Sequence, residues 1–127
     1  MKTIIKTSYA PAPLGPYNQA ILVDSILYIS GQIAIKPSTG NLITGNIEKE
    51  TTQVMMNLEA ILTAAQMSFE NVVKSSIFIS NMQDFPEINK VYGSYFNEAV
   101  APARETVEVA RLPKDVAIEI SMIAHKE

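Results

Sequence analysis

The pattern of apolar and polar positions predicts short strands that alternate with two helices. Two β-rich runs, Gln19 to Val23 and Ile26 to Ile33, are separated by the polar pair Asp24-Ser25, which predicts a hairpin. One more strand is expected before this hairpin. A Pro/Gly-dense stretch between them, residues 10–17, predicts an ordered loop that ends on Tyr17, because proline forbids regular helix.

The middle of the chain predicts a helix followed by a strand. From Ile47 to Ala65, apolar side chains recur at i, i+3, i+4 and i+7, and Asn46 is the expected N-cap. The run from Val72 to Ser80 alternates as a strand does. One face of this strand is predicted to hold Val73, Ser75, Ile77 and Ile79, and the other Lys74, Ser76, Phe78 and Ser80.

The last third predicts a second helix and two strands. Asp84 is the expected cap of the helix, with a glutamate three positions later completing a capping box, and the helix is expected to end at residues 99–102. Its apolar stripe consists of Phe85, Ile88, Val91, Tyr92, Tyr95 and Phe96. Strands from Arg104 to Ala110 and from Val116 to Ala124 follow, joined by the turn at 111–115. The order β-β-β-α-β-α-β-β with adjacent antiparallel pairs is typical of an α+β fold, here one domain over residues 1–127.

Two helices can cover only one face of such a sheet. The runs 26–29 and 116–120 nevertheless supply apolar side chains to both faces. A large exposed apolar surface normally marks an interface. The sequence therefore predicts a homo-oligomer that packs through the uncovered face of the sheet.

Composition then excludes several kinds of chemistry. The chain has no cysteine and one histidine, His125 near its C-terminal end, which excludes a thiolate zinc site, a cysteine nucleophile and a multi-histidine metal site. The net charge is −3 and the lysines are scattered, so no nucleic-acid partner is expected. No signal peptide or membrane-spanning run is visible, which predicts a cytoplasmic protein.

Two charged residues are candidates for chemistry. Arg104 is one of only two arginines, and its guanidinium matches a carboxylate in a bidentate manner. Glu119 is the one carboxylate in the otherwise almost uncharged run 116–123, where it would be at an edge, paired or functional. A structural ion pair between the two residues is the alternative to a functional role.

Polar residues of weaker signal accompany them. Ser30 and Gly31 end a predicted strand, where glycine marks a bulge or a close approach of another group. Tyr17 is either a packed anchor or a hydroxyl directed into a cleft. Asn89 interrupts the apolar stripe of the second helix, as a surface residue or as the lining of a site.

In this order and spacing, the motifs resemble the RidA family, also called the YjgF or reactive-intermediate-deaminase family. The matching segments are Gly15-Pro16-Tyr17, the stretches 29–33, 84–85, 88–89 and 91–92, and the most specific block, from Pro102-Ala103-Arg104 through 107 and 109–115 to Ile118-Glu119-Ile120. The resemblance spans essentially the whole chain.

This resemblance implies a chorismate-mutase-like (ferredoxin-like) mixed sheet with two helices on one face. It also implies a homotrimer that forms a central barrel, with clefts between subunits. The implied activity is that of a 2-iminobutanoate/2-iminopropanoate deaminase, without metal or organic cofactor. Such an enzyme hydrolyses reactive 2-imino acids and 2-aminoacrylate, released by pyridoxal-phosphate-dependent serine and threonine dehydratases, to 2-oxo acids and ammonia.

The resemblance also implies roles for individual residues. Arg104 matches the arginine that holds the substrate carboxylate, and Glu119 is expected to orient or deprotonate the attacking water. Tyr17 is a possible proton relay. Ser30, Gly31 and Asn89 line the cleft. Thr106 stands where many members have cysteine and is expected to contribute its backbone carbonyl, whereas Glu105 departs from the small or apolar residue usual after the arginine, and the departure is expected to affect substrate preference.

Three alternatives to the deaminase remain open on the sequence. A non-catalytic carboxylate-binding or regulatory module is one, although the presence of Arg104 favours the enzyme. An endoribonuclease of the translation-inhibitor type is the second, against which the acidic net charge argues. A chorismate mutase is the third, but it would need more cationic groups than one arginine per cleft.

Overall fold

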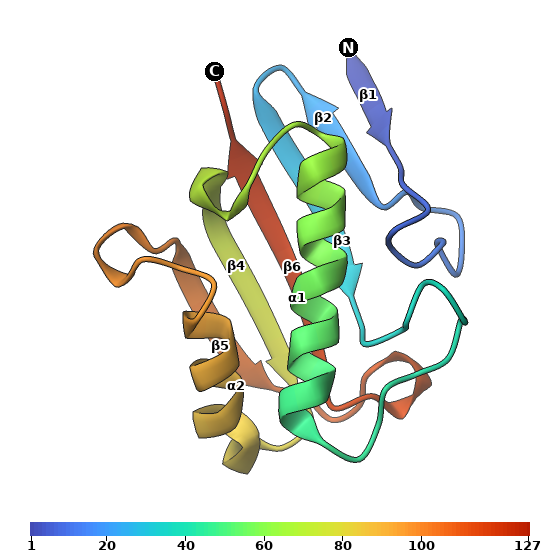
Figure 1. Cartoon of the computed structure of the whole chain (residues 1–127), viewed down its shortest axis with the longest axis vertical. Helices are drawn as coiled ribbons and strands as arrows, with labels where there is room; N and C mark the ends of the chain where they lie inside the picture. The colour runs from blue at the N-terminus through green and yellow to red at the C-terminus, as the bar shows by residue number, and fades with distance from the viewer.

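Six strands form one mixed sheet in the order β1-β2-β3-β6-β4-β5, with both helices on one face (Figure 1). The computed structural model describes all residues, 1–127. The strands are β1 (Lys2–Ile5), β2 (Ala20–Val23), β3 (Ile26–Gln32), β4 (Val72–Ile79), β5 (Ala103–Glu108) and β6 (Ile118–His125). The helices are α1 (Ile47–Ala64) and α2 (Phe85–Gly93), with short 3₁₀ turns η1 (Phe69–Asn71), η2 (Met82–Asp84), η3 (Glu98–Val100) and η4 (Pro113–Asp115). The predicted α+β class is confirmed.

The long helix α1 organises the core as its periodicity predicts. Its N-cap Asn46 accepts a hydrogen bond from the backbone N–H of Lys49 at 3.0 Å. Its apolar stripe is fully buried and consists of Val54, Met55, Leu58, Ile61 and Leu62. Burying one such side chain stabilises the fold by roughly 1.5–3 kcal/mol. The stripe packs on the face of β3 and β6 that carries Leu27, Ile118 and Ile120, all without exposed surface.

The strand pairing differs from the chain order at the second half of the sheet. The last two strands, β5 and β6, are not neighbours, because β4 lies between them. Strand β4 pairs antiparallel with β6 and parallel with β5, which forms an edge of the sheet. The 111–115 turn therefore ends a crossover past β4 rather than a hairpin.

The predicted assignment of β4 side chains to the two faces of the sheet is wrong at Val73. Val73 is 49% exposed, whereas Val72 is buried at 4%. The register between β4 and β6 shifts between Val72 and Lys74, which places one extra residue on β4. This irregularity reverses the alternation at the start of the strand, and the predicted faces hold from Lys74 onward.

The second helix is shorter than its apolar pattern predicts. Asp84 makes no capping hydrogen bond because it already has helical backbone angles at the end of η2, whose N-cap is Asn81. Helix α2 ends at Gly93, well before residue 99. The apolar repeat continues past that point because Tyr95 and Phe96 pack edge-on against Phe69, with ring centroids 5.2 and 5.4 Å apart.

The opposite face of the sheet carries apolar side chains that neither helix covers. Its cross-strand rows follow from the register: Tyr28, Ile123 and Lys74 in one, Ser121, Ser76 and Glu105 in the next, and Glu119, Phe78 and Val107 in the third. Tyr28 is 47% exposed and Val107 39%. The uncovered apolar face predicted from the sequence is confirmed, and we call it the open face.

A buried carboxylate gives this fold a testable pH dependence. Glu50 on α1 is 5% exposed, and its carboxylate accepts a hydrogen bond from the backbone N–H of Ala117 at 3.4 Å. Burial raises the pKa of Glu50 above 4.5, the nearby Asp84 raises it further, and the Ala117 N–H partly opposes both. Because the pKa is higher in the folded chain than in the unfolded one, ionisation of Glu50 penalises the fold, and its contribution to stability falls as the pH rises above about 4.5.

We therefore expect Glu50→Gln to stabilise the protein at pH 8, because the neutral amide avoids the cost of a buried charge. The gain should disappear well below pH 4.5, where Glu50 is protonated in both the folded and the unfolded chain. Thermal unfolding at the two pH values measures the difference, with Glu70→Gln, at an exposed position on η1, as control. A variant that is less stable than wild type at both values would show that the charged bond to Ala117 dominates.

Candidate functional site

The guanidinium of Arg104 is held in place by three side chains of α2. Its Nη1 donates a hydrogen bond to the amide oxygen of Asn89 at 2.8 Å. Its central carbon lies 5.0 Å from the ring centroid of Tyr92 and 5.6 Å from that of Phe85. Both distances fall within the range of cation–π attraction. Asn89 is thus a direct neighbour of Arg104, and most of the guanidinium donors stay without a partner in the chain.

The sequence spacing explains this arrangement. Phe85, Asn89 and Tyr92 are four and three residues apart, so they share one face of α2. Tyr92 is fixed in turn, because its hydroxyl donates a hydrogen bond to the buried Ser75 hydroxyl at 2.9 Å. Burial raises the pKa of Tyr92, against the lowering effects of the Ser75 bond and the Arg104 charge. The neutral phenol therefore stays a stable support for the guanidinium.

Sequence reasoning missed the roles of Phe85 and Tyr92. It assigned both residues to the apolar stripe of the helix, although Tyr92 packs on the core and Arg104 at once. The signal was available: two aromatic residues flank Asn89 at helical spacing, on the helix that precedes the arginine strand. A ring at each side of an amide can hold a planar cation.

Thr106 follows Arg104 on the same side of β5, as the strand alternation predicts. Arg104 pairs with Ser75 and Thr106 with Ile77, both of which face the helices. The Thr106 hydroxyl oxygen is buried and has no hydrogen-bond partner, and no other buried side-chain nitrogen or oxygen of the chain is in that state. The hydroxyl therefore adds a desolvation cost without a compensating contact within the chain.

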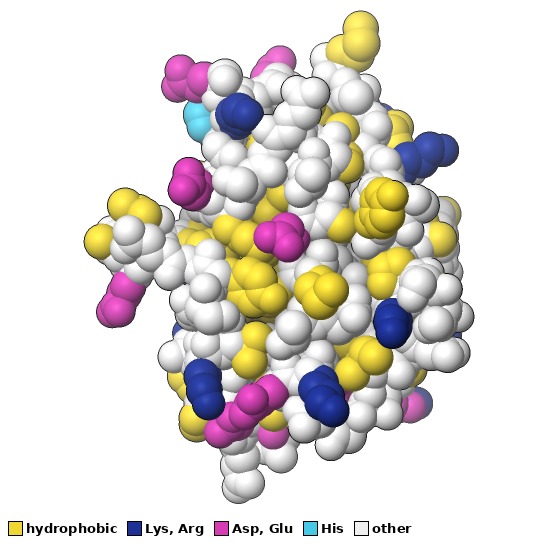
Figure 2. Space-filling view, viewed as in Figure 1, with side chains coloured by type: hydrophobic (Ala, Val, Ile, Leu, Met, Phe, Trp, Pro, Cys, Tyr) yellow, Lys and Arg dark blue, Asp and Glu magenta, His cyan; other side chains and the backbone are white.

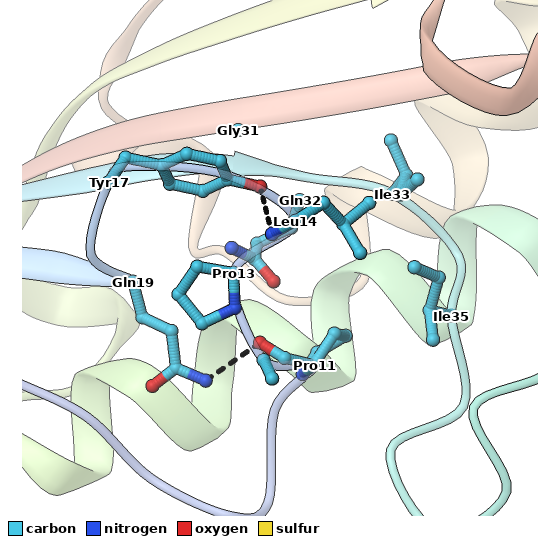
Figure 3. A pocket seen from close by; sticks show the side chains of 10 residues that line it. Pro11, Pro13, Leu14, Tyr17, Gln19, Gly31, Gln32, Ile33 and Ile35 are labelled. Atoms are coloured by element: carbon cyan, nitrogen blue, oxygen red, sulfur yellow. Dashed lines mark hydrogen bonds between the residues drawn. The ribbon is translucent and has the colours of Figure 1, made fainter.

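Four other predicted residues gather around the central strands β3 and β6, namely Tyr17, Ser30, Gly31 and Glu119. The Tyr17 hydroxyl accepts a hydrogen bond from the backbone N–H of Leu14 at 3.1 Å and keeps its own proton (Figure 3). The Ser30 hydroxyl donates to the carbonyl of Asn18 at 2.6 Å, which leaves its lone pairs to accept. Tyr17, Gly31 and Gln32 also line a small hollow between the Pro-rich loop and β3.

Glu119 lies directly over Gly31. A Cβ atom placed on Gly31 would be 2.5 Å from Oε2 of Glu119, so a larger residue there would require the Glu119 side chain to move. Both sequence reasons for this glycine are confirmed: the register between β3 and β6 shifts between Ile29 and Gln32, as at a bulge, and another group approaches closely. Burial raises the pKa of Glu119 above its ordinary value. A half-buried carboxylate with a raised pKa beside a backbone without a side chain is suited to accept a proton.

Arg104 and Glu119 lie on opposite faces of the sheet. Arg104 and Thr106 point to the helix-covered side, whereas Glu119 shares an open-face row with Phe78 and Val107. The alternative of an Arg104–Glu119 ion pair is therefore wrong. One copy of the chain does not bring its predicted residues into a single cleft.

Glu105 and Arg111 are placed away from the guanidinium of Arg104. Glu105 lies on the open face, where its carboxylate pairs with the Lys74 ammonium at 2.9 Å and accepts a hydrogen bond from Ser76. Arg111 forms a bidentate pair with Asp115, at 2.5 and 3.1 Å. This pair closes the turn in which Lys114 and Asp115 both have positive φ.

The largest groove of the surface contains none of the predicted site residues. The largest groove runs along the outer side of α1, between the loops at 7–9 and 36–38. The chain has no group of three or more His, Asp or Glu side chains placed to hold a metal ion. None of its helices is long and apolar enough to cross a bilayer.

Comparison with known proteins identifies the family. Residues 7–126 match the family model described as Endoribonuclease L-PSP. The chain belongs to this family, the RidA/YjgF family. A RutC family protein of Synechocystis is 52% identical over 95% of this chain and 94% of its own. The 2-iminobutanoate/2-iminopropanoate deaminase of Mus musculus is 43% identical over 98% and 91%.

Solved structures agree with the fold. The Rid-family protein YyfA of Yersinia pestis, of unknown function, has a TM-score of 0.96 at 45% identity and covers 99% of this chain and 100% of its own. The structure of E. coli TdcF with bound serine has a TM-score of 0.92 at 39% identity, over 98% and 99%. The predicted family fold is thus confirmed.

The unpartnered Thr106 hydroxyl yields a prediction. We expect Thr106→Val to raise the stability by about 1 kcal/mol, because an unsatisfied buried polar group costs about 1–3 kcal/mol and valine has nearly the same shape. Urea unfolding measures the change. A loss of stability would show that the hydroxyl has a partner in the assembled protein, and Thr52→Val, at a threonine whose hydroxyl donates to the Glu48 carbonyl, is the control.

Proposed function

We propose that this protein hydrolyses 2-imino acids and their enamine tautomers to 2-oxo acids and ammonia, without a metal or cofactor. The observation that carries the proposal is the Arg104 guanidinium, held by Asn89, Tyr92 and Phe85 with most of its donors unused. A planar cation fixed in this way matches a small carboxylate. The mouse relative's name and the serine bound to the E. coli relative support the same ligand class.

Each part of the substrate has a counterpart among these residues. Arg104 binds the carboxylate. Glu119 orients a water molecule and accepts its proton as the oxygen attacks the C=N carbon. The Ser30 hydroxyl, which already donates to Asn18, accepts a hydrogen bond from the substrate N–H. The nitrogen gains the proton that Glu119 took from the water, which gives a tetrahedral amino alcohol. Transfer of the hydroxyl proton of this intermediate to the amine, through Glu119 or Tyr17, then releases ammonia as the carbon–oxygen double bond of the 2-oxo acid forms.

The complete site requires two copies of the chain. Because Arg104 and Glu119 lie on opposite faces of one sheet, a cleft that holds both needs Arg104 of one subunit and Glu119 of the next. The open face supplies the apolar surface for such an assembly. We therefore propose a cytoplasmic homotrimer with three shared clefts.

The family description keeps an endoribonuclease as the second candidate. Binding to RNA would need a basic surface. The net charge is −3, and the helix-covered face carries Lys and Arg interspersed with Asp and Glu (Figure 2). These features do not favour RNA as a ligand.

A module that binds carboxylates without turnover differs from the enzyme in one measurement, ammonia release from freshly generated 2-aminoacrylate.

Arg104 should be essential for substrate binding. A charge-assisted bond to a carboxylate is worth about 1.5–3 kcal/mol, so Arg104→Ala should weaken 2-oxo acid binding about 10- to 150-fold and reduce imine hydrolysis. Arg104→Lys should weaken binding and hydrolysis less than Arg104→Ala, because lysine keeps the charge but cannot donate two parallel hydrogen bonds to the carboxylate. Arg111→Ala, which opens the turn at Asp115, should lower stability or assembly more than turnover. Calorimetry, the deaminase assay and light scattering are applied to all three variants, and wild-type rates in an assembled Arg104→Ala trimer would refute the site.

Glu119 should govern the rate and its pH dependence. Glu119→Gln keeps the shape but cannot accept a proton, so turnover should fall about 100-fold or more while 2-oxo acid affinity stays within about 5-fold. In the wild type, turnover should rise with pH as Glu119 ionises, through a pKa raised above 4.5 by burial. The variant should lack this rise. Unchanged turnover in the Glu119→Gln variant would show that Glu119 does not take part in the reaction.

A shared cleft predicts complementation between two inactive variants. When Arg104→Ala and Glu119→Gln subunits are unfolded together and refolded as mixed trimers, some clefts combine the intact Glu119 of one subunit with the intact Arg104 of another. Activity should return to a substantial fraction of wild type, whereas each variant refolded alone stays inactive. Native mass spectrometry verifies the mixing, and mixed trimers without activity would place both residues of a cleft in one subunit.

A further inference from the structure

The buried side-chain amide of Gln19 holds the first part of the Pro-rich loop. Gln19 lies directly before β2 and is 2% exposed. Its Oε1 accepts a hydrogen bond from the backbone N–H of Thr7 at 2.7 Å. Its Nε2 donates to the carbonyl oxygens of Thr7, Ala10 and Pro11 at 3.0, 3.2 and 2.8 Å, and the bond to Pro11 is drawn in Figure 3. One side chain therefore contacts four backbone groups of this segment.

The segment has no other polar attachment. The hydrogen bonds that link residues 7–13 to the rest of the chain all involve the Gln19 side chain. Two prolines in this segment have no N–H to donate. Ala10 is its one fully buried residue, at 3% exposure. The position of the segment thus depends on one amide and one methyl group.

The backbone at the same position holds Ser30. The carbonyl of Gln19 accepts a hydrogen bond from the Ser30 N–H at 2.9 Å, and the carbonyl of Asn18 accepts one from the Ser30 hydroxyl at 2.6 Å. Tyr17 precedes Asn18 and ends the Pro-rich loop, where its hydroxyl contacts the Leu14 N–H. Gln19 therefore joins the two hydroxyls of the proposed site, because its side chain holds the loop that carries Tyr17 and its main chain holds Ser30.

Glutamine is suited to these contacts because one planar group offers an acceptor oxygen and two N–H donors. Glutamate would place a second oxygen against three carbonyl oxygens, and methionine would leave them without a donor. A backbone carbonyl that is buried without a partner costs free energy, so the loop would move toward water once the amide is lost. Such a movement would displace Tyr17 and the hollow that it lines together with Gly31.

We infer that Gln19 is a positioning residue of the proposed site, which couples the loop that carries Tyr17 to the backbone that carries Ser30. For its effect on turnover, the inference rests on the proposed function. The amide has no free group to offer a substrate, because it is buried and used in contacts to residues 7–11. Its effect is exerted through Tyr17 and Ser30, whereas Arg104 has its own support on α2.

The test compares Gln19→Met with a variant that is destabilised outside the site. Methionine has a similar length but makes none of the four hydrogen bonds. The control is Val72→Ala, which removes buried methyl groups from β4. For both variants and the wild type, kcat, KM, 2-oxo acid affinity and backbone hydrogen exchange are measured. Circular dichroism and light scattering verify that each protein is folded and assembled like the wild type.

The expected result is a loss of turnover without a loss of carboxylate binding. In Gln19→Met, kcat should fall about 100-fold, because a displacement of about 1 Å at reacting groups has an effect of this size. The 2-oxo acid affinity should stay within about 5-fold, since Arg104 keeps its support. The amides of Thr7 and Ser30 should both exchange about 10-fold faster or more, while Val72→Ala leaves kcat and this pair of amides close to wild type. Wild-type kcat in folded Gln19→Met, or an equal loss in Val72→Ala, would overturn the inference.

The wild type decides the question if Gln19→Met does not fold. Thr7 lies outside every strand, and its N–H is bonded to Gln19 alone. This amide should therefore exchange at least about 100-fold more slowly than an unprotected amide, and it should open together with Ser30 at low denaturant concentration. Exchange of Thr7 within about 5-fold of the unprotected rate would overturn the inference.

Failure of the proposed reaction gives a different result. An assembled wild type without deaminase activity refutes the reaction, whereas hydrogen exchange is measured without substrate. Faster exchange at both Thr7 and Ser30 in Gln19→Met would then still support the coupling and reject only the enzyme. An active wild type together with an equally active Gln19→Met would reject the positioning role alone.

Discussion

The unequal covering of one sheet is the constraint on which the rest of this structure depends. Both helices pack on the same face, where α1 buries a full apolar stripe against β3 and β6. The other face holds Tyr28, Phe78 and Val107 with no layer of the chain above them. Apolar area left in water forgoes about 25 cal/mol per Å² of stabilisation, so the uncovered face is unfavourable for an isolated chain.

Local signals in the sequence were sufficient for much of the fold. The Asp24-Ser25 hairpin, the Asn46 cap and the α1 periodicity all depend on residues close in the chain, and the structure has them. The errors arose where tertiary contacts decide. The extra residue before Lys74 depends on pairing with β6, and the early end of α2 depends on Phe69. Neither partner is near in sequence.

The site shows the same division between residue identity and geometry. Composition and spacing singled out Arg104, Asn89 and Glu119, the family resemblance implied their roles, and the structure places Arg104 against Asn89. The sequence did not indicate that Arg104 and Glu119 face opposite sides of the sheet. The face on which a strand residue lies depends on how its strand pairs with the neighbouring strand. The aromatic support of Arg104 was hidden for another reason, since a ring that packs on a core has the same periodicity as a ring that holds a cation.

The contact between Gly31 and Glu119 constrains how this protein can vary. The carboxylate occupies the space in which any other residue at position 31 would place its Cβ. An alanine there would displace Glu119 from the position that the proposed chemistry needs, even though position 31 contributes no side chain of its own. A residue with a Cβ at position 31 therefore requires the Glu119 carboxylate to lie elsewhere, so the geometry of this carboxylate depends on a residue 88 positions away that contributes no side chain.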